Sequence, residues 1–507
     1  MLSRIFGLVR DILFAQLFGT SLAADAFNLA YRLPTFLRRV FGEGVMNAAF
    51  IPTFTQHRID QGEEESSRLA SQVFWALSIL LGGAVLLAMV AAPWLVALFA
   101  RGWAGEPEKL ALTTHITRLI FPYVFLVGLA VLVMGMLFAR RRFLAASLSS
   151  TIFSLGWVAG AVVALTFAEE TGPRLDYYCY GLLAGSLGQF LVQLPALRNA
   201  GITLTRWRGP RMPELRIIGN LMLPGIAGLA VVQINSLADT IFATLLPTGA
   251  VTALSLGNRV MLLPLAIFAT AVSSAALPAL SNQVHTDGPV RAKASVSFSL
   301  RFLLFFLIPS TVGLWLLARP IIRLLFLRGE FDEESLTMTA AALGFYAIGL
   351  IAFGCLKAVA PYFFSMRDTR TPVVAGAVAM VVNIIMNAAL YKPMGVTGLA
   401  LATSVAGFVN LALLLAILAR RHGWLESPVA LPAVRMSLAA LFMVPAIQWI
   451  SPLLEPAPGS GTPAQLAHVG GTIGAGLLAY GAASLIVARD VTREVFASLF
   501  GRALSRR

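Results

Sequence analysis

The segments PWLVALFARG, residues 93–102, and PIIRLLFLRG, residues 320–329, are two versions of one sequence, aligned without a gap. Proline, leucine, phenylalanine, arginine and glycine coincide at an offset of 227 residues, from 93 to 320. Other equivalent positions lie at this offset or one residue less: Arg32 and Arg259, Glu106 and Glu333, Phe138 and Phe364, and residues 49–52 and 275–278. A nearly constant offset at separate places argues against chance likeness between apolar segments. The sequence therefore predicts an internal repeat, as transporters often contain.

The composition indicates a membrane protein. Of the 507 residues, 58% are hydrophobic and only 12% are charged, whereas soluble domains carry about 25% charged residues. Repeated long apolar runs favour helices over a β-barrel. The net charge of +14 is explained by Lys and Arg in cytoplasmic loops, so we expect membrane lipids and no nucleic acid as partners. Cys179 and Cys355 have neither disulfide nor metal-site spacing.

The hydropathy pattern predicts an all-α polytopic fold with about fourteen membrane-spanning helices. The predicted spans are residues 1–19, 24–54, 70–100, 111–139, 143–168, 175–197, 216–246, 249–282, 296–326, 334–364, 371–391, 395–419, 429–451 and 466–488. The even-numbered connections are basic, as at Arg140-Arg141-Arg142, and the odd-numbered loop 327–335 is mainly acidic. The positive-inside rule then places both termini in the cytoplasm.

The repeat divides these spans into two copies of a six-helix unit. Because six is even, the two copies insert in the same orientation and form parallel repeats. The predicted domains are 1–214 (spans 1–6), 215–427 (spans 7–12) and 428–507, which holds spans 13 and 14 and a cytoplasmic tail. Within span 14, Gly470-x-x-x-Gly474 permits a close helix–helix contact.

Arginines at membrane depth are the strongest functional signal. A charge at the bilayer centre costs at least about 2.5–3.5 kcal/mol, so such residues normally face a cavity or the interior of a bundle. Guanidinium groups match phosphate oxygens two bonds at a time. The sequence therefore predicts an anion cavity between the halves of the chain, lined by Arg4, Arg10, Arg38 and Arg259.

Some of the basic residues admit a second interpretation. Arg32 and Arg39 would equally well extend to the cytoplasmic interface, and Arg4 stands near the chain start, where it could be interfacial. Pro34 should kink the second span and free backbone groups at depth.

A lone acid, Asp239, falls in the middle of span 7. Asn383 and Asn387 in span 11 and Thr403 in span 12 supply further oxygens, which suit a hard cation such as Na⁺. The alternative is an interhelical hydrogen-bond cluster that only stabilises the second repeat. Signatures of catalysis, such as H-E-x-x-H, a P-loop or a nucleophile elbow, are absent from the sequence, so we expect a transporter and not an enzyme.

Several motifs resemble the MurJ (MviN) family of lipid II flippases, which belongs to the multidrug/oligosaccharidyl-lipid/polysaccharide exporter superfamily. The similar segments are Ser3-Arg4-Ile5-Phe6-Gly7-Leu8-Val9-Arg10-Asp11, Asp25-Ala26-Phe27, residues 32–44, Arg328-Gly329-Glu330-Phe331 and residues 367–372. Members of that family usually carry more residues before the Ser-Arg pair. We therefore expect either a start upstream of Met1 or a short cytoplasmic end of the first helix.

The resemblance implies a function and its residues. It implies flipping of lipid II across the cytoplasmic membrane for peptidoglycan synthesis, with a groove beside the last two helices for the lipid tail and cell-wall synthesis machinery as a further partner. The substrate-binding residues it implies are Arg4, Arg10, Asp25, Arg38 and Arg259, and it places sodium in some members at Asp239, Asn383, Asn387 and Thr403. Two rival functions are export of O-antigen lipid or drugs by the same superfamily, and a membrane-embedded enzyme that consumes lipid II.

Overall fold

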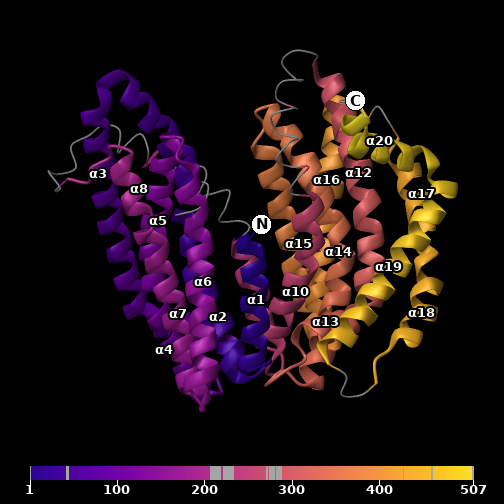
Figure 1. Ribbon diagram of the computed structural model, residues 1–507, viewed down its shortest axis with the longest axis horizontal. Coiled ribbons are helices and arrows are strands. Elements are labelled where there is room, and N and C mark those ends of the chain that lie inside the picture. The colour runs from indigo at the N-terminus through magenta and orange to yellow at the C-terminus, as the bar shows by residue number, and fades with distance from the viewer. Residues whose placement is uncertain are drawn as a thin grey trace. The chain divides into compact units, whose positions relative to one another are not determined.

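The structure is a computed structural model, and it describes residues 2–41, 45–205, 219–220, 233–269, 272, 280, 288–425, 428–457 and 461–504. Every regular element within these ranges is a helix (Figure 1), which confirms the predicted all-α class. Ten helices in the described ranges are long and apolar enough to cross a membrane. The predicted number of fourteen spans and the parallel repeats stay predictions.

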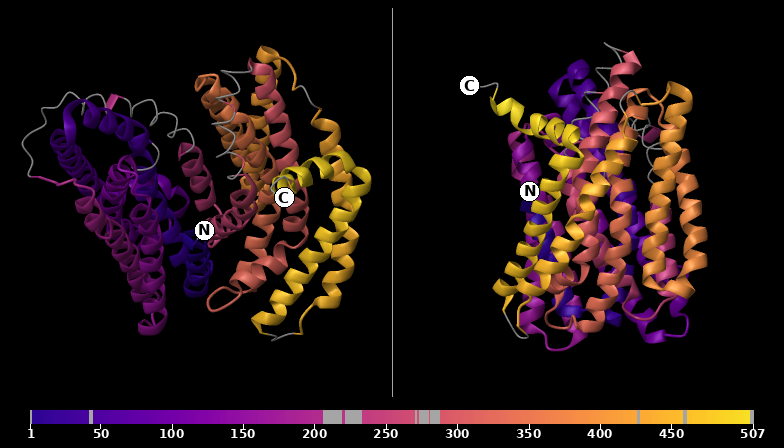
Figure 2. Two further views of the ribbon diagram at one scale, coloured as in Figure 1. Left: turned by 45° about the horizontal axis from the view of Figure 1, so that its top comes forward. Right: turned by 90° about the vertical axis from the view of Figure 1, so that its right-hand side faces the viewer.

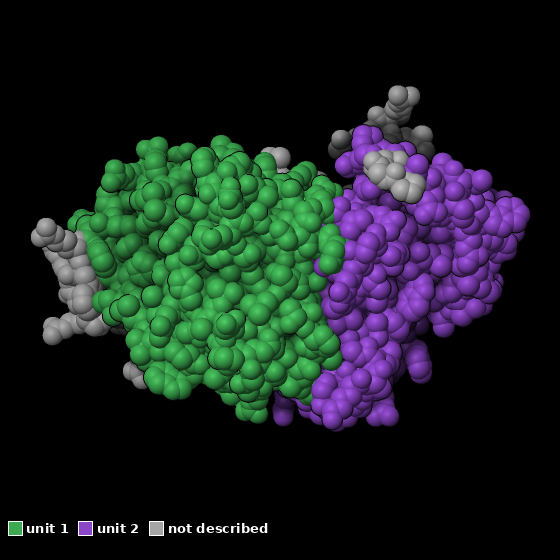
Figure 3. Space-filling view, turned by 90° about the horizontal axis from the view of Figure 1, so that it is seen from below, with its two compact units in different colours: residues 1–252, 328–332 green, residues 253–327, 333–507 purple. Residues whose placement is uncertain are grey.

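The chain forms two compact units, which Figure 3 shows in separate colours. Unit 1 comprises residues 1–252 and 328–332. Its helices are α1 (Leu2–Phe18), α2 (Leu22–Phe41), α3 (Val45–Phe99), the short η1 (Arg101–Trp103), α4 (Pro107–Ile120), α5 (Pro122–Ala139), α6 (Phe143–Phe167), α7 (Thr171–Leu191) and α8 (Gln193–Asn199). Residues 233–244 are also helical.

Two boundaries in unit 1 differ from the predicted spans. The second span, 24–54, is divided between α2, which continues through Pro34 to Phe41, and α3, which begins at Val45. Residues 42–44 lie outside the described ranges. The helix α3 is interrupted at Gly62, whose φ of 88° is in the region that favours glycine.

The helices α6 and α7 pack through glycines. A Cβ atom on Gly156 would lie 2.4 Å from the Cα atom of Gly185, and one on Gly160 would lie 2.4 Å from the Cα atom of Gly181. Each helix thus presents two glycines one turn apart, and their backbones approach closely, as small-xxx-small motifs in membranes do. Beside this crossing, the Trp157 ring is buried among aromatic side chains of α2 and α7.

Unit 2 comprises residues 253–327 and 333–507. Its helices are α10 (Ala250–Pro264), which begins in unit 1 and continues as the π-helical turn η2 (Leu265–Ala269), α12 (Gly288–Leu316), α13 (Ala318–Phe326), α14 (Glu333–Ser365), α15 (Arg370–Met394), α16 (Val396–His422), α17 (Ala430–Leu441), α18 (Met443–Leu454), α19 (Thr462–Val487) and α20 (Arg489–Leu504). The predicted span 13 corresponds to α17 and α18, and span 14 corresponds to α19.

The helices α17, α18 and α19 lie side by side in both views of Figure 2 and pack against α12. The close contact that Gly470-x-x-x-Gly474 permits is not made within the described chain, because both glycines face open space. The close contacts come instead from Gly476, opposite Ile447, and from Gly471, opposite Leu454. The sequence spacing was suitable, but the face of α19 that turns toward α18 is a different one.

Candidate functional site

The arginine of α1 that the structure describes fully is Arg10. Its Nε and Nη2 atoms donate to Oδ1 of Asp11 at 2.9 and 2.7 Å, and its guanidinium carbon lies 4.2 Å from the centre of the Trp157 ring. The side chain is only 17% exposed. Asp11 and Trp157 thus hold this charge in one orientation, by an ion pair and a cation–π contact. The side chain of Arg4 lies outside the described residues.

The arginines of α2 divide between different faces of that helix. Arg32 donates to the backbone oxygen of Ser236 at 2.9 Å and to the hydroxyl of Thr240. Arg39 donates to Oε1 of Gln233 at 3.3 Å. Arg38 is half-buried; on a helix it lies about 100° from Arg39. Arg32 and Arg39 therefore attach α2 to residues 233–244, and Arg38 points elsewhere.

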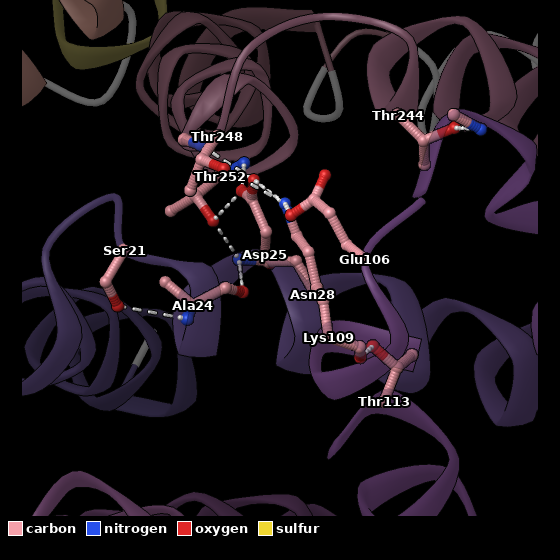
Figure 4. A network of polar contacts seen from close by, with 12 residues as sticks. Ser21, Ala24, Asp25, Asn28, Glu106, Lys109, Thr113, Thr244, Thr248 and Thr252 are labelled. Carbon is pink, nitrogen blue, oxygen red and sulfur yellow. Dashed lines mark hydrogen bonds and ion pairs between the residues drawn. The ribbon is translucent and has the colours of Figure 1, made fainter. Parts of the chain in front are cut away.

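Asp25 is buried and bound to the beginning of α10 (Figure 4). Its Oδ2 atom accepts a hydrogen bond from the backbone N–H of Gly249 at 2.7 Å. Its Oδ1 atom accepts from the backbone N–H and the hydroxyl of Thr252, at 2.9 and 2.8 Å. Asn28 donates to the same Thr252 hydroxyl at 3.0 Å. The carboxylate therefore caps the N-terminus of α10, where backbone N–H groups and the helix dipole both favour a negative charge.

Lys109 brings a buried cation to this network (Figure 4). Its side chain is 1% exposed, and its Nζ atom lies 3.8 Å from Oδ2 of Asp25 and 3.7 Å from Oε2 of Glu106. It donates to the Thr248 hydroxyl at 3.2 Å and lies 4.2 Å from the centre of the Trp103 ring. A buried charge is tolerated when it is paired and hydrogen-bonded, and Lys109 meets both conditions.

Two loop glycines at equivalent positions of the predicted repeat make equivalent contacts. The backbone N–H of Gly102 donates to the Thr244 hydroxyl at 3.3 Å, and a Cβ atom on Gly102 would lie 2.0 Å from the Thr244 carbonyl oxygen. A Cβ atom on Gly329 would lie 2.3 Å from the carbonyl oxygen of Gln16, which also accepts from the N–H of Glu330 at 3.0 Å. Each Arg-Gly loop thus closes the end of one helix within unit 1.

The other predicted site residues lie as follows. Arg259 is half-buried on α10 in unit 2, and Asp239 is half-buried on residues 233–244 in unit 1. In unit 2 the structure brings Asn383, Asn387 and Thr403 together, all between α15 and α16. Asn387 donates to Asn383 at 2.9 Å, and Asn383 donates to the Thr403 hydroxyl at 3.5 Å.

These oxygen donors are of the class that sodium prefers, but Asn383 and Thr403 already bond to one another. The carboxylate of Asp239 belongs to the other unit. Among the described residues, no group of three or more His, Cys, Asp or Glu side chains is arranged to hold a metal ion.

The motif at residues 367–372 closes the start of α15. Asp368 accepts hydrogen bonds from the backbone N–H and the hydroxyl of Thr371, at 2.9 and 2.6 Å, and from Arg421 at 3.0 Å. Burial alone would raise the pKa of Asp368, but these hydrogen bonds and the Arg421 charge outweigh it and hold the pKa below its ordinary value. The motif is a structural cap in unit 2.

Sequence reasoning missed Lys109, Trp157 and the partner of Asp25. Lys109 lies at the start of an apolar span, where a lysine normally reaches the interface. One signal for Thr252 was present: Asp25 and Thr252 are separated by 227 residues, which is the offset of the predicted repeat.

Comparison with known proteins gives one consistent family. The family described as "Lipid II flippase MurJ" matches residues 14–460. A "Probable lipid II flippase MurJ" from Rhizobium meliloti is 34% identical and covers 99% of this chain and 96% of the relative. A protein of the same description from Vibrio cholerae is 32% identical over 89% of this chain and 88% of the relative.

Solved structures agree with the sequence matches. A structure described as "Lipid II flippase MurJ, inward closed conformation" covers 96% of this chain and 97% of its own, with a TM-score of 0.79 and 27% identity. An inward-facing multidrug transporter of the MATE family aligns with a TM-score of 0.72 at 14% identity, covering 83% of this chain and 94% of its own. The second likeness concerns the fold alone.

Proposed function

Because the chain belongs to the lipid II flippase MurJ family, we propose that it moves lipid II, the lipid-linked peptidoglycan precursor, across the cytoplasmic membrane by alternating access. The family is one of transporters, so the protein is a multi-pass inner-membrane transporter and not an enzyme. In the proposed cycle, the polar head of lipid II binds on the cytoplasmic side, the protein rearranges, and the head is released outside.

The observation that carries the proposal is the set of arginines on α1 and α2. Arg10 lies mostly buried beside Trp157 and Arg38 is half-buried on α2, in helices that the sequence predicts to lie in the membrane. Holding guanidinium groups there is costly, and the diphosphate of lipid II would offset that cost by charge-assisted hydrogen bonds. We assign Arg10, Arg38 and Arg259 as diphosphate ligands and Arg4 as a further one.

Asp25 is the exception among the proposed substrate residues. A carboxylate repels a diphosphate, and both oxygens of Asp25 already accept hydrogen bonds from residues 249–252. We propose that Asp25 acts on transport by holding the start of α10, with Lys109 as its counter-charge, and that it does not touch the substrate.

We further propose that the chain contains two parallel six-helix repeats, in domains 1–214 and 215–427, followed by 428–507, with both termini in the cytoplasm. The equivalent contacts of Gly102 and Gly329 support this arrangement, because equivalent segments of two parallel repeats should make equivalent contacts. A membrane potential that is negative inside would favour export of the anionic head, by about 2.3 kcal/mol per charge per 100 mV.

We also propose that side-chain oxygens bind a sodium ion, and the residues that would supply them are Asp239, Asn383, Asn387 and Thr403. The oxygen donors of α15 and α16 support it chemically. Enzymes of cell-wall synthesis that use the flipped lipid are proposed partners.

The test compares Ala and Lys variants of Arg10, Arg38 and Arg259. Loss of one charge-assisted contact should weaken lipid II binding by about tenfold to a hundredfold, and Lys should be intermediate because it lacks the guanidinium fork. Binding to purified protein and growth after depletion of the native protein are measured, with membrane insertion verified. Arg68→Ala is the matched control, since Arg68 pairs with Glu64 and Glu65 on the surface of α3. Normal binding by Arg10→Ala and Arg38→Ala would contradict the proposal.

A further inference from the structure

A pocket of about 440 Å³ opens within unit 1 between α2, α3 and residues 233–244. Its walls are almost entirely hydrocarbon and include Leu33, Phe36 and Leu37 of α2, Leu95 of α3, and Leu237 and Ile241. The volume is within the range of about 300–1,000 Å³ that is typical of ligand sites. It therefore suits a segment of a hydrocarbon chain and excludes a polar head.

The contact between α2 and residues 233–244 has a polar side as well. Arg32 donates to Ser236 and Thr240, and Arg39 donates to Gln233. Arg32 and Arg39 are seven residues apart and so lie on nearly the same face of α2, next to the face that lines the pocket. Two guanidinium groups thus lie on the face of α2 next to the one that lines the apolar pocket, and they bond to the helical residues 233–240 that form its opposite wall. This charge arrangement complements an anionic amphiphile whose charge lies at one end of its chain.

We propose that this pocket receives a segment of the polyprenyl chain of a polyprenyl diphosphate substrate, close to the diphosphate. The proposal rests on the proposed function, which assigns the diphosphate partly to Arg38. Residues 32–39 of α2 span only about 10 Å, so a chain attached to a diphosphate at this helix begins within reach of Leu33, Phe36 and Leu37. The pocket in unit 1 is separate from the groove beside α17–α19 that the family resemblance implies for the tail.

Chain binding in this pocket gains little from hydrophobicity, because the lipid around the protein is as apolar as the pocket. The gain comes from packing and from tethering, since the bound diphosphate raises the effective concentration of its own chain at the pocket. We therefore expect the pocket to determine the position of the polyprenyl chain and to add little to the affinity. A chain linked to a bound diphosphate should outcompete a membrane lipid for the pocket.

The experiment uses the full chain, purified in nanodiscs, and a short polyprenyl diphosphate that carries a diazirine on an isoprene unit near the diphosphate. After irradiation, mass spectrometry locates the labelled residues. Competition is measured with unlabelled lipid II and, separately, with phosphatidylglycerol. Ala238→Phe places a ring on a residue that lines the pocket. Ala97→Phe adds the same ring on the exposed face of α3 and is the control.

We expect label on α2 and on residues 233–244 that lipid II removes and phosphatidylglycerol does not. Ala238→Phe should lower this label by about tenfold, because the phenylalanine ring would occupy the space that the tethered polyprenyl chain would otherwise fill. Ala97→Phe should leave the label unchanged. Competition by phosphatidylglycerol to the same extent would identify an ordinary lipid contact and overturn the inference. Label that lipid II removes only from other helices would overturn the inference and leave the proposed function standing. Absence of any label that lipid II removes would overturn both.

Discussion

Replacing Asp25 by asparagine should loosen the start of α10 without changing the shape of the side chain. The carboxylate accepts three hydrogen bonds, two from backbone N–H groups and one from a hydroxyl. An asparagine has one acceptor oxygen, and its amide would turn a donor toward either Gly249 or Thr252. One buried N–H group therefore loses its partner in any orientation of the new side chain.

The expected cost follows from these contacts. A buried N–H group without a partner costs about 1–3 kcal/mol, and hydrogen bonds to a charged acceptor are stronger than neutral ones by about 1 kcal/mol each. The sum is about 2–4 kcal/mol, before counting Lys109, whose Nζ atom would lose the carboxylate 3.8 Å away. A local opening that becomes easier by this amount lowers amide protection by about thirtyfold to a thousandfold.

Hydrogen–deuterium exchange of residues 249–252 in purified protein measures this directly. Asp176→Asn is the control, because Asp176 is 38% exposed and pairs with His115, and exposed pairs contribute at most about 1 kcal/mol. Growth after depletion of the native protein shows whether transport depends on the contact. Unchanged protection at Gly249 and Thr252 in the Asp25→Asn protein would refute the capping role.

Two further changes test the packing of the chain. Gly102→Val and Gly329→Val should each destabilise the protein and impair growth, because the valine side chains would collide with the carbonyl oxygens of Thr244 and Gln16. Gly105→Val is the control, because Gly105 faces open space. Equal melting temperatures for all three variants would contradict the expected collision. Gly160→Leu should separate α6 from α7 and lower the melting temperature in detergent by several degrees, as overpacking costs about 1–3 kcal/mol, whereas Gly83→Leu on α3 should not; equal stability of both variants would mean that the glycine crossing is unimportant.

The sequence predicted the helical class because long apolar runs reflect strong solvation energies, whereas the depth of the arginines in the membrane stays a prediction. Apolar runs, and charges within them, can be recognised in a sequence without knowing which residues contact one another. The rotation of a helix about its own axis cannot be predicted from the sequence in this way. Gly470 and Gly474 have suitable spacing but face open space, and Gly156 and Gly160, with the same spacing, form the close crossing. Which face turns inward depends on the neighbours of a helix, and these are known only after the chain has folded.

The same limit applies to Asp25, whose contacts could not be predicted from the sequence. The resemblance to the flippase family implies a substrate role for Asp25, whereas in the structure its carboxylate accepts hydrogen bonds from backbone N–H groups at the start of α10. The acid and its partner Thr252 occupy equivalent positions of the predicted repeat, each next to an odd-numbered connection, and the charge pattern predicts these connections to lie outside. The contacts of Gly102 and Gly329 fall on odd-numbered connections as well. A transporter that alternates must break closing contacts on one side in each cycle, so their strength has to stay within a few kcal/mol. Three hydrogen bonds to one carboxylate, with a lysine beside it, are of that order, which is why a single asparagine should suffice to shift the balance.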